Sequence, residues 1–224
     1  MLEPAHVSLF NPALYSGVRQ PLQRATTLPS WCYTSQKWFD REFTSIFQPA
    51  WHFIGLASSI PNRGDYLTSS PLGLGVLVVR DDEGQVNAFR NSCRHRGSLL
   101  LEKPSGTCRA IRCQYHSWTY SLEGRLLKAP GMEKQERFDP TDRGLLAVRC
   151  EVLQGLVFVT FSSDTPLLGT YLGDFEQVVA APRRISEMVC VHQHTRANFT
   201  ETPGPAPGHE HAAGPHTTRP DRHL

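Results

Sequence analysis

Two short motifs that each combine one cysteine with one histidine constrain this chain more than any other feature. Residues 93–95 read Cys-Arg-His and residues 113–116 read Cys-Gln-Tyr-His, with 17 residues between the first histidine and the second cysteine. Each motif can present one thiolate and one imidazole from a tight loop. The first follows a predicted strand, and the second precedes a predicted hairpin. We therefore expect two hairpin tips that enclose one metal centre, with Cys93, His95, Cys113 and His116 as its candidate ligands.

Three interpretations of these motifs compete. The first is a [2Fe-2S] cluster with two cysteines on one iron and two histidines on the other. The second is a structural zinc site with two cysteines and two histidines, and the third is coincidence. Zinc modules usually group Cys with Cys and His with His along the chain. Here each loop supplies one of each, which favours the cluster.

The middle of the chain, residues 48–163, has the pattern of one β domain. Apolar and polar residues alternate there, and glycine-bearing turns separate the alternating runs, which is typical of a sandwich or small barrel. The expected strands are 51–56, 66–69, 75–80, 85–90, 119–122, 125–128, 145–152 and 156–161. Asp81-Asp82-Glu83-Gly84, Glu123-Gly124 and Gln154-Gly155 mark three hairpin turns.

The flanks of this domain have other patterns. Residues 1–30 show no periodicity and predict an extended arm, and aromatic residues spaced three and four apart predict a helix over 35–47, capped by Thr34 or Ser35. Residues 166–182 have helical spacing, and 185–199 loosely resemble a strand. Residues 200–224 are rich in proline, glycine and histidine and predict a disordered tail.

Composition excludes several classes of protein. The net charge of +2 gives no strong attraction to nucleic acid or to a membrane surface. The longest apolar run is too short to cross a bilayer, and the first thirty residues lack a signal peptide. Six scattered cysteines do not form a disulfide framework, so Cys32, Cys108, Cys150 and Cys190 are expected to be free thiols. These features favour a cytoplasmic protein.

The two motifs with their flanks, Cys93-Arg94-His95-Arg96-Gly97 and Cys113-Gln114-Tyr115-His116-Ser117-Trp118, resemble the paired signatures of Rieske iron–sulfur domains. The ending of the second is similar to that of ring-hydroxylating and related oxygenases, and the resemblance extends over residues 28–180. It implies a mainly β fold: a Rieske-type antiparallel sandwich with a cluster-binding hairpin subdomain, a short N-terminal helix and a C-terminal helical segment. Residues 129–131 would form a third loop that shields the cluster.

The chain differs from respiratory Rieske proteins at positions that influence the reduction potential of the cluster. Those proteins bridge the two loops with a disulfide whose cysteines would fall at Ser98 and Tyr115, so that bond cannot form here. Trp118 stands where they carry a serine that donates to a cluster sulfur, and such bonds raise the potential. We expect a potential low in the Rieske range of about −150 to +300 mV.

Other residues near the motifs have modest expected roles. Arg94 and Arg96 could dock an acidic partner, although solvated loop arginines are the simpler interpretation. Trp118 and Tyr120 are expected to be core aromatics beneath the cluster. Tyr115 could cover the cluster or could simply pack nearby. The outer ring nitrogens of the two histidines face a partner or solvent and could form the electron exit.

The resemblance also implies a second, C-terminal domain with a non-haem Fe(II) on two histidines and one carboxylate. The stretch 197–199 resembles the beginning of that segment, but residues 200–224 do not continue the resemblance. The tail offers isolated candidates in an unstructured setting: Glu201, His209, Glu210, His211, His216 and Asp221. We interpret 164–199 as a linker and the start of a missing catalytic domain. Residues 200–224 are interpreted as a possible product of a shifted or shortened reading frame.

By resemblance, then, the chain is the N-terminal Rieske part of an oxygenase large subunit. Such enzymes take electrons from an NAD(P)H-dependent reductase or a ferredoxin, oxidise a small organic substrate with O₂ and assemble as homotrimers. The similarity of 34–56 to oxygenases such as choline monooxygenase suggests a quaternary ammonium substrate. The alternatives are a stand-alone Rieske ferredoxin-like carrier, a catalytically inactive fragment and a zinc protein.

Overall fold

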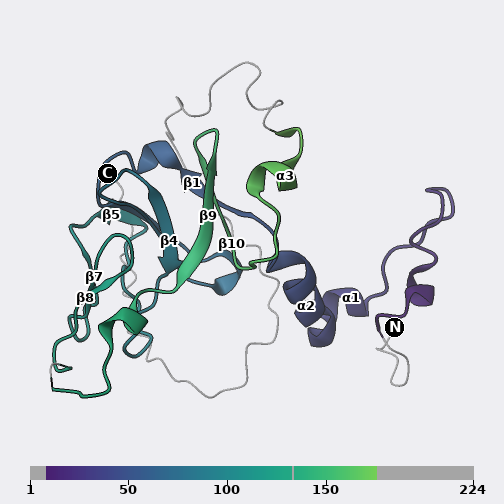
Figure 1. Cartoon of the computed structure of the whole chain (residues 1–224). Coiled ribbons are helices and arrows are strands. Elements are labelled where there is room, and N and C mark those ends of the chain that lie inside the picture. The colour runs from purple at the N-terminus through teal and green to yellow at the C-terminus, as the bar shows by residue number, and fades with distance from the viewer. Residues whose placement is uncertain (1–8, 133, 176–224) are drawn as a thin grey trace, which may run out of the picture. The chain divides into compact units, whose positions relative to one another are not determined.

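The computed structural model describes residues 9–132 and 134–175 (Figure 1). By backbone contacts the chain divides into Met1–Gln193 and His194–Leu224, and the described residues all belong to the first unit. The expected strand at 185–199 and the expected disordered tail at 200–224 lie outside the described residues. So do the six tail candidates for iron ligands.

Within the described residues, ten antiparallel strands form two sheets, which confirms the mainly β prediction. The larger sheet has the order β1-β10-β9-β4-β3-β2-β5 and the smaller one the order β6-β7-β8 (Figure 1). The larger sheet contains β1 (His52–Leu56), β2 (Asp65–Ser69), β3 (Val76–Arg80), β4 (Val86–Arg90), β5 (Ser105–Thr107), β9 (Ala147–Leu153) and β10 (Leu156–Thr160). The smaller sheet contains β6 (Ile111–Arg112), β7 (Thr119–Tyr120) and β8 (Leu126–Lys128).

The three hairpins predicted from glycine-bearing turns are confirmed as β3–β4, β7–β8 and β9–β10. The short strands β5 and β6 were not predicted, because segments of two or three residues are too brief to show alternation. Strand β9 pairs with β10 along five residues and with β4 through only two, at Val148 and Ala147. This brief pairing lets one continuous antiparallel sheet curl.

Strand β3 is buried on both faces, which explains its uninterrupted apolar sequence. Val76 and Val78 belong to a core inside the curled sheet, with residues of β1, β9 and β10. Leu77 and Val79 belong to a second core, shared with the hairpins that carry the Cys and His motifs. All four side chains have no solvent-exposed surface. Burying each such side chain stabilises the fold by about 1.5–3 kcal/mol. Because its two faces belong to different cores, β3 joins the sheet to the hairpins that carry the motifs.

The helices confirm the sequence prediction in part. Helix α2 (Gln36–Glu42) begins after Ser35, whose hydroxyl accepts from the Trp38 amide, and a π-helical turn (Phe43–Phe47) continues it. Helix α1 (Trp31–Thr34) precedes it. Single 3₁₀ turns lie at Pro12–Tyr15, Ala57–Ser59, Pro71–Gly73 and Pro140–Arg143. Within the described ranges, no helix has the length and apolar character needed to span a bilayer.

The arm predicted as extended instead packs on the helices. Leu9 and Tyr15 are buried against Trp31 and Cys32, and the Tyr15 hydroxyl donates to the Leu9 carbonyl. These contacts join residues distant in sequence, so periodicity could not reveal them. At the other end, α3 (Leu168–Leu172) confirms helix within the predicted 166–182, and Gly173 (φ 61°) ends it.

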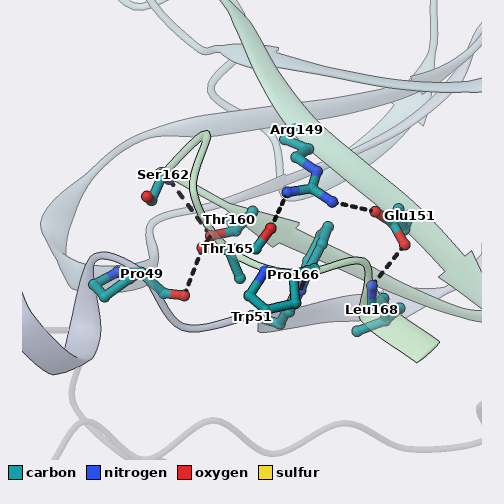
Figure 2. A network of polar contacts seen from close by, with 9 residues as sticks. All are labelled: Pro49, Trp51, Arg149, Glu151, Thr160, Ser162, Thr165, Pro166 and Leu168. Carbon is teal, nitrogen blue, oxygen red and sulfur yellow. Dashed lines mark hydrogen bonds and ion pairs between the residues drawn. The ribbon is translucent and has the colours of Figure 1, made fainter. Parts of the chain in front are cut away.

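An ionic network holds the segment that leads from β10 into α3 (Figure 2). The Arg149 guanidinium donates to the Thr165 carbonyl and to Glu151 Oε1 at 2.9 Å. The other carboxylate oxygen of Glu151 accepts from the Leu168 amide at 2.8 Å, which caps α3. The guanidinium also lies 5.0 Å from the Trp51 ring centre. Each charge thus has its opposite partner and a backbone partner.

Hydroxyl and indole groups complete this attachment. Trp51 Nε1 donates to the Pro166 carbonyl at 3.0 Å, and Thr165 Oγ1 donates to the Pro49 carbonyl at 2.7 Å (Figure 2). Thr160 and Thr165 share a further bond of 3.1 Å. The exit segment is therefore attached to β9, to β10 and to the residues just before β1 before α3 begins.

Two hairpin glycines offer a matched test of how the β7–β8 hairpin packs. Gly84 and Gly124 have similar positive φ angles of 79° and 85°. A Cβ at Gly84 meets nothing within 4 Å, whereas one at Gly124 lies 2.4 Å from Phe89 Cε1 on β4. We expect Gly84→Ala to lower the free energy of unfolding by about 1 kcal/mol through backbone strain. Gly124→Ala should cost about 2–4 kcal/mol because overpacking adds to that strain. Urea denaturation measures both, and equal losses would contradict this packing.

Candidate metal centre

The two motifs fold into loops with the same backbone hydrogen-bond pattern. In the first loop, after β4, the Cys93 amide donates to Ser98 and the Gly97 amide donates back to Cys93, at 2.8 and 2.9 Å. In the second, between β6 and β7, the Cys113 amide donates to Trp118 and the Ser117 amide to Cys113, at 2.8 and 3.1 Å. Each loop thus closes around its own cysteine, as the sequence predicted for two hairpin tips.

A left-handed residue closes each loop at the same place. Gly97 has φ 74° and Ser117 has φ 60°, each four residues after its cysteine. Glycine adopts this conformation freely, whereas serine is strained in it. In the second loop, Arg112 Nη2 donates to the Ser117 hydroxyl at 2.8 Å, which helps to hold the strained residue.

The two cysteine thiols meet in the core between the loops. Cys93 is 3% exposed and Cys113 1%, and the groups lie close enough to shift each other's pKa. Burial raises the pKa of Cys93. Burial opposes ionisation of Cys113 too, but hydrogen bonds from the backbone N–H groups of Tyr115 and His116, together with those from the Cys93 and Ser98 side chains, hold its pKa below the ordinary value. Donors directed at sulfur are the environment that a metal-bound thiolate requires.

The two histidine rings also meet. Their centres lie 4.7 Å apart, and the ring of His95 stacks on Trp118 at 4.8 Å with an interplanar angle of 5°. Burial, with help from His116 and Arg96, lowers the pKa of His95 and favours the neutral imidazole that binds metals. Nδ1 of His95 is buried and has no hydrogen-bond partner among the described residues. A buried nitrogen without a partner is costly, unless it coordinates a metal.

Tyr120 contacts the centre more directly than the sequence suggested. Its hydroxyl accepts from the Arg94 amide at 3.1 Å and lies 3.3 Å from Cys93 Sγ. Because the oxygen already accepts a bond, its own hydrogen is available for the sulfur. The sequence pattern predicts only a core aromatic here. The missed signal is that Trp118 and Tyr120 are two residues apart, a spacing that places both side chains on one face of an extended backbone.

The other residues near the two motifs are either packed in the core or exposed on the surface. Trp118 is buried and meets Phe138 edge to face at 5.5 Å, and Ala129 of the expected third loop packs on the same core. Tyr115 is 65% exposed, with its ring 3.9 Å from that of His116. Of the other cysteines, Cys32, Cys108 and Cys150 are free thiols, and Cys190 lies outside the described residues.

The arrangement suits a [2Fe-2S] cluster. The two thiols lie beside each other and the two imidazoles lie beside each other, so a bound cluster would have two cysteines for one iron and two histidines for the other. Among residues 9–132 and 134–175, no three His, Cys, Asp or Glu side chains converge as a ligand group for a metal ion. The fit to a cluster therefore rests on the paired like ligands and on the unpartnered Nδ1 of His95.

Comparisons with known proteins agree with this geometry. The family model described as the Rieske [2Fe-2S] domain matches residues 50–146. The large subunit of anthranilate 1,2-dioxygenase from Burkholderia cepacia is 32% identical over 82% of this chain and 46% of its own length. The oxygenase subunit of glycine betaine monooxygenase from Chromohalobacter salexigens is 37% identical over 69% of the chain and 34% of its own.

Solved structures give the same result. The crystal structure of the apo form of CntA, a quaternary ammonium Rieske monooxygenase, matches with a TM-score of 0.66 and 30% identity. The match covers 69% of this chain and 45% of that one. The chain thus spans less than half the length of the relatives it matches.

Removing the Tyr120 hydroxyl should lower the reduction potential of the centre. A donor to a ligand sulfur stabilises the reduced, more negative state. We expect Tyr120→Phe to lower the potential by roughly 40–60 mV, since about 1–1.4 kcal/mol corresponds to that shift for one electron. Tyr66→Phe, in the same core but without a ligand contact, should leave the potential unchanged. Spectroelectrochemical titration measures both, and equal potentials for Tyr120→Phe and the wild type would exclude this role.

The two left-handed loop residues should respond differently to substitution. A Cβ at Gly97 meets only Ser92 Oγ at 3.9 Å, so Gly97→Ala adds backbone strain alone and should destabilise by about 1 kcal/mol. Ser117→Gly removes similar strain but loses the bond from Arg112, so its net effect should lie within about 0.5 kcal/mol of zero. In an Arg112→Met background, Ser117→Gly should stabilise by about 1 kcal/mol. Urea denaturation of the four variants tests this, and destabilisation in that background would refute the strain.

Proposed function

Because residues 50–146 of this chain form a Rieske [2Fe-2S] domain, we propose that the chain binds the cluster through Cys93, His95, Cys113 and His116. In this role it passes electrons from a reductase or ferredoxin to the non-haem iron of an oxygenase. One observation carries the ligand assignment: the fold brings the two buried thiols together and the two imidazoles together, and it leaves Nδ1 of His95 without a partner.

The protein's own residues provide most of what the centre needs. When bound, the cluster supplies a site that accepts and releases one electron at a time. Backbone N–H groups and the Tyr120 hydroxyl stabilise charge on the two sulfurs. Trp118 fixes the plane of the His95 ring, and the surrounding core excludes water. A buried, rigid ligand set reorganises little when its charge changes.

The oxygenase activity is a proposal about the whole protein. Relatives in both comparisons are oxygenases, and the chain covers less than half of each. The elements α2 and α3 lie outside the β domain, and a simple electron carrier would not need them. We propose that the electron acceptor is an iron site in the part of an oxygenase that this chain does not match. A cytoplasmic location suits the free cysteines.

For the substrate we propose a quaternary ammonium compound. The relative with 37% identity acts, by its name, on glycine betaine, and CntA is by name a quaternary ammonium monooxygenase. The dioxygenase of anthranilate has a lower identity, 32%, although it matches a longer part of the chain, 82%. Glycine betaine, choline and carnitine would be the first compounds to test on a full-length relative.

Metal analysis with electron paramagnetic resonance tests the proposal. We expect two irons per chain and the signal of a reduced [2Fe-2S] centre after dithionite. Cys93→Ser and Cys113→Ser should each abolish the signal, because serine cannot replace a thiolate on this iron. Cys150→Ser is the control: burial raises the pKa of Cys150 to about 12, and the partly buried residue packs against the core inside the sheet. One zinc per chain and no signal would overturn the proposal.

A further inference from the structure

A cavity lies at one end of the curled sheet, beside the brief pairing of β4 with β9. Its volume is about 610 Å³, which falls within the range of small-molecule sites. The wall is built from segments distant in sequence: the residues before β1 and β3, the end of β4, the start of β9 and the end of β10. The open ends of barrel-like sheets are common places for such sites.

Arg90, the last residue of β4, lines this cavity. Its side chain shares a face of the strand with Ala88, which belongs to the core inside the sheet. The guanidinium packs on Phe161, with its carbon 5.2 Å from the ring centre. It makes no hydrogen bond or ion pair with the described residues, and its Nη1 is buried from solvent.

A cation in this position needs an anion. Arginine stays protonated in proteins, and a buried nitrogen that has lost water without gaining an acceptor destabilises the fold. The other cation of the wall, Arg149, already pairs with Glu151 at 2.9 Å. Among the described residues that line the cavity there is no aspartate or glutamate. An acceptor for Arg90 therefore has to come from outside this wall.

A second donor lies in the wall, on the loop after β10. Ser162 Oγ accepts a hydrogen bond from the Asp164 amide at 3.2 Å, so its own hydrogen is available to a ligand. The loop is held in place, because the Ser162 amide donates to Thr160 Oγ1 at 3.5 Å and Thr160 in turn bonds to Thr165 (Figure 2). The cavity thus offers a hydroxyl in addition to the guanidinium.

The rest of the wall is largely apolar. It includes Leu74, Leu146, Val148 and Phe161, and Val148 belongs to the buried core inside the sheet. An inorganic anion would leave this apolar surface in water, whereas the carbon body of an organic acid would cover it. The planar fork of an arginine matches the two oxygens of a carboxylate. The wall therefore suits an anion with an apolar body.

We propose that this cavity binds a small organic carboxylate. The carboxylate bonds to Arg90 and Ser162, and the apolar body packs against Phe161 and the neighbouring aliphatic side chains. The site is separate from the metal centre. Arg90 shares its face of β4 with the core inside the sheet, whereas the preceding Phe89 belongs to the core shared with the Cys and His loops. The inference therefore does not depend on the proposed function.

Isothermal titration calorimetry of the full chain with benzoate tests the proposal. We expect one benzoate per chain with a Kd of about 1 mM or lower. Benzamide, its neutral isostere, should bind about tenfold more weakly or worse, because it cannot form a charge-assisted bond. Arg90→Met should raise the Kd for benzoate about tenfold or more for the same reason, and Ser162→Ala about threefold. Arg19→Met, at an exposed arginine outside the wall, is the control and should stay close to the wild type.

Urea denaturation gives a second readout. Without ligand, Arg90→Met should unfold at no lower urea concentration than the wild type, because an apolar side chain replaces an unpaired cation. Saturating benzoate should raise the urea midpoint of the wild type and leave that of Arg90→Met unchanged. If the Arg90 variant does not fold, Ser162→Ala and the comparison of benzoate with benzamide still decide the question.

Three results would overturn the proposal. The first is the absence of benzoate binding, which would mean that Arg90 obtains its acceptor in another way. The second is an equal loss of binding in Arg90→Met and in the Arg19→Met control. The third is binding of acetate or inorganic phosphate as tight as that of benzoate, because the cavity would then hold an anion without a place for an organic body.

Discussion

The meeting of two separately closed loops over one core is the constraint on which this structure depends. Cys93 and Cys113 lie in different hairpins, yet their buried thiols must face each other. The core that allows this contains Leu77 and Val79 of β3, together with Tyr120 and Ile111. Because the other face of β3 belongs to the core inside the sheet, the position of the thiols is coupled to the folding of the whole β domain.

Local signals predicted most of the fold. Glycine turns and alternation located the three main hairpins, and Ser35 marked the start of α2, because these features depend on neighbours in sequence. Strands β5 and β6 were missed because they are too short to show alternation. The packing of Leu9 and Tyr15 on Trp31 was missed because it joins distant residues.

In the candidate centre, too, local features could be predicted from the sequence and contacts between distant residues could not. Spacing and residue type were enough to select four candidate ligands, and the fold brings the two thiols together and the two imidazoles together. The contact of Tyr120 with Cys93 depends on the register of β7, which sequence alone does not give. This hydroxyl acts against the low potential expected from Trp118, because any donor to sulfur raises the potential. The balance between them is a property of the folded hairpin.

The two loops differ in one respect, the position of their histidine, and this difference makes the two ends of the histidine pair unequal. Their backbone bonds are the same, but histidine is the second residue after Cys93 and the third after Cys113. This offset of one residue turns the two rings to different surroundings. His95 lies against the buried Trp118, and His116 lies against the exposed Tyr115. One extra residue in an otherwise repeated loop thus breaks the symmetry of the site and gives it an inner and an outer histidine.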